Sequence, residues 1–123
     1  MVQKTFNYES RGVRYNNCYF DVGEYKDGSK EISIYGNVED DNNISHISNM
    51  TINVKENLKE TEAVVDNISN TNLISFLLEL GIIKNISRRI MVNGIKFPVA
   101  ELDLNVLEEY SYIYQEEELR YAS

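Results

Sequence analysis

Residues 13–38 read VRYNNCYFDVGEYKDGSKEISIYGNV, two runs of alternating residues joined by Asp27-Gly28. An Asp-Gly pair between such runs is typical of a β-hairpin, so we predict strands over 13–25 and 30–39. A three-residue loop with Gly28 in the left-handed conformation sets the pairing of the two strands. It predicts these pairs: Glu24 with Lys30, Val22 with Ile32, Phe20 with Ile34, and Cys18 with Gly36. One apolar face results, which a one-residue slip would scatter; it holds Cys18, Phe20, Val22, Ile32, Ile34 and Val38.

Further strands are predicted on both sides of this hairpin. Lys4–Tyr8 precedes the hairpin and is joined to it by a turn at 9–12. Ile44–Val54 follows the hairpin after a turn at 40–43. Glu62–Val65 reads as a short strand or an extended loop. Asn93-Gly94 predicts a second hairpin, formed by Ser87–Val92 and Ile95–Leu102. It would pair Val92 with Ile95, Ile90 with Phe97 and Arg88 with Val99. Because Pro98 lacks an amide hydrogen, we expect its strand at a sheet edge.

Two helices complete the predicted fold. A nearly apolar segment, 72–80, lies between a possible N-cap at Asn70 and a C-terminal Gly81. A second helix would begin at Asn105, with an apolar side at helical spacing made by Val106, Leu107, Tyr110, Ile113 and Tyr114. The expected class is α+β, in a single domain over 1–123: a mainly antiparallel sheet of five to seven strands built from hairpins, one short buried helix and one C-terminal amphipathic helix, both on one sheet face.

Composition and charge exclude several functional classes. Lys+Arg 12 against Asp+Glu 20 gives a net charge of −8. That charge argues against direct binding to a nucleic-acid backbone, which needs a basic face. One cysteine excludes an internal disulfide. Apolar runs such as Ile74–Leu80 are too short to cross a bilayer, and residues 1–30 lack the pattern of a secretion signal. We therefore expect a cytoplasmic protein of a bacterial host cell that contacts no membrane.

The sequence offers little for catalysis or metal binding. Cys18 is the one thiol and His46 the one imidazole, and Cys18 is predicted on the apolar face. No nucleophile-elbow, phosphate-loop or paired metal-ligand spacing occurs. The acidic turn 39–43 lacks the ligand positions of a calcium loop. We therefore expect no enzyme activity, no metal and no cofactor. A basic cluster, read either as a solvated strand face or as an anion site, contains Lys84, Arg88, Arg89 and Lys96.

Tyrosines and carboxylates are the candidate binding residues. The hairpin register places four tyrosines on the face opposite Phe20, with Tyr19 directly across from Tyr35: Tyr15, Tyr19, Tyr25 and Tyr35. Either the C-terminal helix covers this strip through Tyr110 and Tyr114, or the strip is exposed and binds a protein. The acidic groups are either solvated or engage a basic nucleic-acid channel of a partner; they are Glu39, Asp40, Asp41, Glu108, Glu109, Glu116 and Glu117.

Residues 50–102 also carry short motifs that match a known pattern. These motifs are Thr51-Ile52-Asn53-Val54, Val65-Asp66-Asn67 with Asn72, the apolar segment Leu73–Leu80, Gly94, and Pro98-Val99-Ala100-Glu101-Leu102. In these features the chain resembles the domain of unknown function numbered 4313, a family of small proteins from plasmids, conjugative elements and phages of low-GC Gram-positive bacteria. Ile68-Ser69-Asn70 departs from the compact Asn-rich turn of that family. The family has no established catalytic residues to transfer.

The resemblance implies a protein of a mobile element, a setting in which small acidic proteins often inhibit host defence. The leading hypothesis is a non-enzymatic acidic inhibitor of the anti-CRISPR or anti-restriction type. It would bind a CRISPR effector nuclease or a restriction enzyme and block its nucleic-acid site. The alternative is an accessory or regulatory protein-interaction domain of a mobile element with no defence role.

Overall fold

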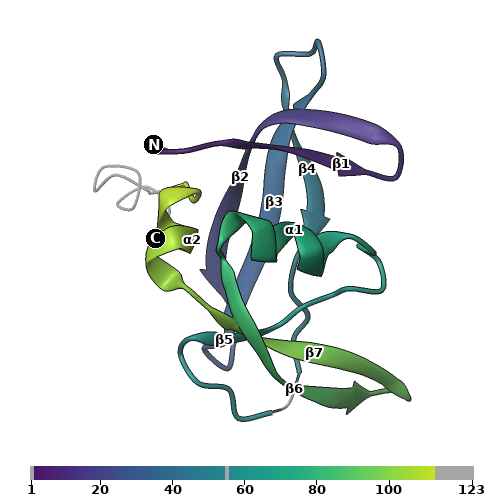
Figure 1. Ribbon diagram of the computed structural model, residues 1–123, viewed down its shortest axis with the longest axis vertical. Coiled ribbons are helices and arrows are strands. Elements are labelled where there is room, and N and C mark those ends of the chain that lie inside the picture. The colour runs from purple at the N-terminus through teal and green to yellow at the C-terminus, as the bar shows by residue number, and fades with distance from the viewer. Residues whose placement is uncertain (1, 55, 113–123) are drawn as a thin grey trace.

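The computed structural model describes residues 2–54 and 56–112, and within them seven strands form two antiparallel sheets (Figure 1). The first sheet has the order β1-β2-β3-β4, and the second has the order β5-β7-β6. The predicted α+β class with mainly antiparallel strands is confirmed, whereas the expected single sheet is divided in two. The strand bounds are β1 Phe6–Ser10, β2 Val13–Glu24, β3 Lys30–Val38, β4 Ile44–Asn49, β5 Glu62–Val64, β6 Ile83–Val92 and β7 Ile95–Leu102.

The β2–β3 hairpin has the predicted register in the half that lies next to its turn. Glu24 pairs with Lys30, and the pairs continue through Val22–Ile32 and Phe20–Ile34, while Gly28 has a φ of 88°. Toward the other end the register shifts between Asn16 and Tyr19. Asn17, with a φ of 55°, is the extra residue of this bulge. A left-handed bulge residue cannot be read from the alternation of apolar residues, so the prediction missed it.

The strand predicted over 44–54 ends early, at Asn49. A second register shift skips Ile47, because Ile34 pairs with Ser48 while Tyr35 pairs with His46. Ile44 and Met50, which an unbroken alternation would place on one face, are therefore separated: Ile44 is 61% exposed and Met50 is fully buried. Beyond Met50 the chain passes to the second sheet through a single bridge, Thr51 with Val65. This passage, shaped by long-range contacts, divides the expected sheet into two.

The second hairpin, β6–β7, has all three of its predicted pairs, around a turn in which Asn93 has a φ of 50° and Gly94 of 80°. The prediction that the Pro98 strand is an edge strand is wrong, because β7 lies between β5 and β6. Pro98 is tolerated because it lies just beyond the last β5 pair. There its carbonyl accepts a bond from the Val65 amide at 3.1 Å. Proline has no N–H group to donate, but at this position no residue of β5 lies opposite to receive such a bond.

Both helices are short. Helix α1, Leu73–Leu80, ends as predicted at Gly81 (φ 81°), but it begins after Asn72 and not at an Asn70 cap. Asn70 is instead buried, and its Oδ1 accepts a bond from the Ser48 hydroxyl at 2.6 Å. Helix α1 buries one side only, since Leu78 is 46% exposed.

Helix α2 comprises Leu104–Glu109, and its N-cap is Asp103 and not the predicted Asn105. The Asp103 carboxylate accepts bonds from the amides of Asn105 and Val106, which explains the earlier start. Leu107 is buried as expected. The helix is shorter than predicted, because it ends at Glu109; Ile113 and Tyr114 lie outside the described residues.

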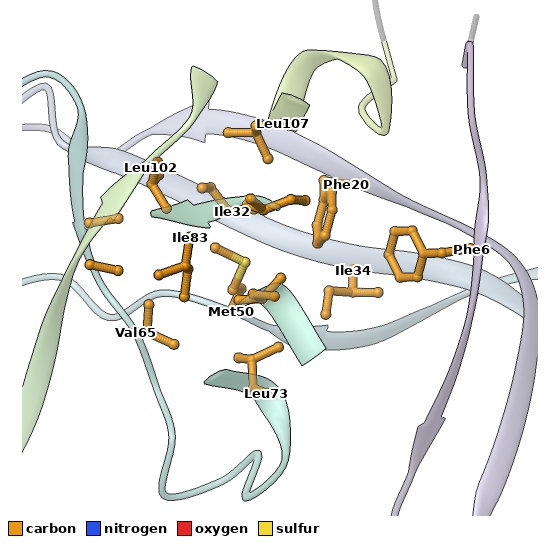
Figure 2. Packing of buried hydrophobic residues seen from close by; sticks show 14 of the residues in the cluster. Phe6, Phe20, Ile32, Ile34, Met50, Val65, Leu73, Ile83, Leu102 and Leu107 are labelled. Carbon is orange, nitrogen blue, oxygen red and sulfur yellow. The ribbon is translucent and has the colours of Figure 1, made fainter. Parts of the chain in front are cut away.

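The main core lies on the inner face of the first sheet, and Figure 2 shows its side chains converging from both sheets and both helices. As expected, both helices pack against this one face, α1 through Leu73 and Leu77 and α2 through Leu107. A smaller cluster on the second sheet contains Val54, Val64, Ile90, Phe97 and Val99. Within the described part of the chain, neither helix is long and apolar enough to span a bilayer.

Candidate functional site

Four aromatic rings form a row across the outer face of the first sheet, and we call them the aromatic row. Tyr19 and Tyr35 occupy opposed positions on β2 and β3, with ring centroids 6.0 Å apart and planes 16° apart. Tyr112 extends the row beyond Tyr19, at 6.1 Å. His46 on β4 closes it, edge-on to Tyr35 at 5.2 Å. The predicted position of Tyr19 opposite Tyr35 is therefore confirmed. Tyr112 and His46, which lie outside the hairpin, extend the row at its two ends.

Tyr112 reaches the row because the chain after α2 continues along the edge of β2. The Phe20 amide donates to the carbonyl of Tyr110 at 2.9 Å, and the amide of Tyr112 donates to the Phe20 carbonyl at 2.8 Å. Ser111 thus pairs with Phe20 in parallel. Tyr112 is thus the aromatic partner from the C-terminal segment, whereas Tyr110 and Tyr114 were the predicted ones. Tyr110 instead packs against the core residue Phe6, with centroids 5.9 Å apart.

A hollow of about 400 Å³ opens on the aromatic row, and its described lining is Tyr19, Asp21, Tyr35 and Tyr112. Partial burial raises the pKa of the Tyr19 hydroxyl, and the nearby Asp21 carboxylate and Tyr35 raise it further. The Tyr19 hydroxyl is therefore protonated at neutral pH and able to donate a hydrogen bond. The described lining of the hollow thus combines three aromatic rings with one carboxylate.

His46 and Cys18 lie on opposite faces of the sheet. His46 is exposed, and its Nε2 donates to the Asn49 Oδ1 at 3.0 Å, an atom that also accepts from the Ser33 hydroxyl at 3.0 Å. Cys18 is fully buried in the core, and that burial raises the pKa of its thiol to about 11. A thiol–imidazole pair needs hydrogen-bond contact between the two groups. The sheet itself separates them, so these two residues cannot form such a pair.

Two of the four predicted strip tyrosines lie elsewhere. The bulge at Asn17 turns Tyr15 to the inner side, where it pairs with Val38 and packs against the core. Tyr25 lies past the end of β2, and its hydroxyl lies 3.3 Å from both the carbonyl and the hydroxyl oxygen of Thr51. Tyr15 thus packs against the core and Tyr25 contacts Thr51 beyond the strand, whereas Tyr19 and Tyr35 lie opposite each other on the outer face.

The predicted acidic residues do not converge on the aromatic row. Glu39, Asp40 and Asp41 are exposed at the turn between β3 and β4, where an Asp41 oxygen accepts from the Asn43 amide. Glu108 is exposed on α2, and Glu109 pairs with Lys4 at 2.9 Å. Figure 1 shows this turn and α2 well apart. Glu116 and Glu117 lie outside the described residues.

One member of the basic cluster, Arg88, pairs with a buried carboxylate, Glu62, that was not among the predicted site residues. Glu62 is 3% exposed, and it accepts bonds from the Lys59 amide, the Ser87 hydroxyl and the Arg88 guanidinium, each at 2.9 Å. These bonds hold the pKa of Glu62 below its ordinary value, with the Lys59 amide contributing most. All four basic residues are exposed, but Arg88 is the one that pairs with Glu62, at 2.9 Å.

The remaining hollows are polar. A larger one, of about 860 Å³, lies between the β2–β3 turn and residues 56–62, and charges of both signs line it. Residues 2–54 and 56–112 contain no group of three potential metal ligands. Compared with protein-family models, with curated proteins and with solved structures, the chain gives no match in any of the three.

Proposed function

We propose that this protein is a non-enzymatic inhibitor that binds a host nucleic-acid-handling defence protein through the aromatic row and blocks its nucleic-acid site. The observation that carries the proposal is the position of Tyr19, Tyr35 and Tyr112 on the solvent side of the first sheet. The inner face of that sheet is already covered by the core, into which one side of each helix packs. Aromatic side chains held away from the core on a rigid sheet are suited to a protein interface.

The tyrosines of the row are ordered before any partner arrives. Tyr19 and Tyr35 contact each other across paired strands, and each has a further aromatic neighbour. A tyrosine has two side-chain torsions and loses little entropy on binding, and prior ring contacts reduce that loss further. The surrounding hydroxyl and amide groups, such as Ser33 and Asn49, supply hydrogen bonds at the rim.

Charge supports the choice of a partner with a basic site. The net charge of −8 favours association with a basic protein surface and disfavours nucleic acid itself. Exposed carboxylates at the β3–β4 turn lie on the same sheet as the aromatic row. An acidic protein seated on a basic nucleic-acid channel would compete with the backbone phosphates, and its association would slow as salt rises.

The accessory interaction domain is the second candidate, favoured by the separation of the acidic residues. Since Glu39–Asp41 and Glu108 lie apart, the aromatic row can act without them, on a partner that is not basic. The two candidates differ in salt dependence. A steep loss of binding between low and high salt supports the inhibitor, and binding that ignores salt supports the accessory domain.

The direct test uses a purified guide-loaded CRISPR effector nuclease and a purified restriction enzyme. DNA cleavage is measured with wild-type protein, with Tyr35→Ala, and with the control Met91→Ala, whose side chain is 58% exposed on the second sheet. We expect inhibition at low salt, a loss of about tenfold or more in Tyr35→Ala, and no loss in Met91→Ala. The proposal is wrong if the protein binds neither enzyme class and protects no host-infecting phage.

A further inference from the structure

We propose that the hollow between Tyr19, Tyr35 and Tyr112 binds the guanidinium group of an arginine side chain presented by the partner protein. This inference rests on the proposed function and names the chemistry that its binding surface recognises. It depends on three features of the hollow: the spacing of its rings, the sign of its charge and its size.

The ring spacing suits a cation. Tyr19 is the middle ring, and its centroid lies 6.0 Å from that of Tyr35 and 6.1 Å from that of Tyr112. A cation held over an aromatic face interacts favourably within about 6 Å of the ring centroid. A cation seated between Tyr19 and either neighbouring ring can lie within that distance of both centroids. Aromatic clusters of this kind are the usual recognition elements for organic cations.

The charge of the hollow has the complementary sign. Asp21 is the one ionisable carboxyl among the four described lining residues, and none of the four is basic. The negative faces of the three rings favour a cation over a phosphate or a carboxylate, and Asp21 adds a carboxylate to the same lining. A neutral ligand such as a sugar could stack on the rings, but it would gain no Coulomb attraction from Asp21.

Arginine matches the hollow better than lysine does. Its planar guanidinium stacks on aromatic rings such as Tyr19 and Tyr35, whereas the lysine ammonium is a compact and strongly hydrated charge. A volume of about 400 Å³ accommodates the guanidinium and part of its stem. Arginine also contacts the phosphates in nucleic-acid sites. An arginine held in this hollow would be withdrawn from the nucleic acid, which links the hollow to inhibition.

The test is a low-salt NMR titration of the full chain with N-acetyl-arginine methylamide, following the ring signals of the tyrosines. The matched probe is the citrulline compound, which has nearly the same shape and no charge. We expect saturable shifts at Tyr19 and Tyr35 with the arginine probe only. Tyr19→Leu should lower the affinity about tenfold, Asp21→Asn should lower it less, and Tyr19→Phe and Met91→Ala should retain it.

Two results overturn the inference: equal shifts from the citrulline compound, or arginine shifts that persist unchanged in Tyr19→Leu. The titration also separates this inference from the proposed function. If the protein inhibits the nucleases but binds no arginine probe, the proposed function stands and the guanidinium site is wrong. If arginine binds but neither nuclease class is bound or inhibited, the site stands and the proposed partner class is wrong.

Discussion

The two faces of the β2–β3 hairpin differ in composition and role, although their residues alternate along the same strands. Phe20 and Ile34 on the inner face are fully buried, and they pack against both helices and the second sheet. Tyr19 and Tyr35 on the outer face are half-exposed and contact other rings at the surface. Neighbouring residues can therefore be substituted separately to test stability and the proposed binding, because successive side chains of a strand point to opposite faces.

The largest expected difference between the faces is in the free energy of unfolding. Phe20→Ala removes a fully buried ring and should cost about 3–5 kcal/mol. Tyr19→Ala, one position away, loses surface ring contacts and should cost about 0.5–1.5 kcal/mol. Urea unfolding followed by circular dichroism measures both values. In the inhibition assay the order reverses: Tyr19→Ala should lose inhibition while it remains folded.

Phe20→Leu is the control for the inner face, since it keeps most of the apolar volume and should recover much of the lost stability. The division of roles between the faces would be refuted if Tyr19→Ala were as unstable as Phe20→Ala. It would also be refuted if Tyr19→Ala retained full inhibition.

A smaller, pH-dependent effect concerns the one thiol of the inner face. Burial raises the pKa of Cys18 to about 11 from an ordinary value of about 9. The folded state therefore favours the protonated thiol. This contribution to stability is complete below pH 9 and is lost as the pH rises toward 11, by at most about 1.4 kcal/mol per pH unit. Urea midpoints measured from pH 8 to pH 11 should fall less steeply in Cys18→Ala than in the wild type.

Tyrosines also titrate in this range, and burial raises the pKa of Tyr8 as well. Only the difference in slope between Cys18→Ala and the wild type reports on the thiol. Parallel slopes would show that Cys18 ionises equally easily in the folded and unfolded states. In addition, a thiol reagent at neutral pH should modify Cys18 only after denaturant is added.

The sequence predicts what depends on local pattern. The register of β2–β3 near Asp27-Gly28, the Asn93-Gly94 hairpin and the end of α1 at Gly81 all follow from turn chemistry and alternation. The opposition of Tyr19 and Tyr35 follows from the same register. These features need only residues close in sequence, and a one-residue error would expose a whole apolar face.

Features that depend on contacts between residues far apart in the sequence could not be predicted from local pattern. The central position of β7 depends on β5 pairing beside Pro98, and the place of Tyr112 depends on backbone bonds to Phe20. Neither contact has a local signal. Tyr15 was assigned to the wrong face for a different reason, because one bulge residue reverses the alternation beyond it.

That bulge gives a further small effect on stability and tests how residues are assigned to the two faces. Asn17 has a φ of 55°, a conformation that asparagine tolerates and β-branched residues do not. Asn17→Val should cost about 1–2 kcal/mol, whereas Asn17→Gly should change stability by less than about 0.5 kcal/mol. The bulge shifts both neighbouring pairings, so that Tyr15 lies opposite Tyr8 on one side and Val38 on the other. Nuclear Overhauser contacts between the Tyr15 and Tyr8 rings should therefore persist in Asn17→Gly. If Asn17→Val were as stable as the wild type, the left-handed conformation of Asn17 would not be a requirement of the bulge.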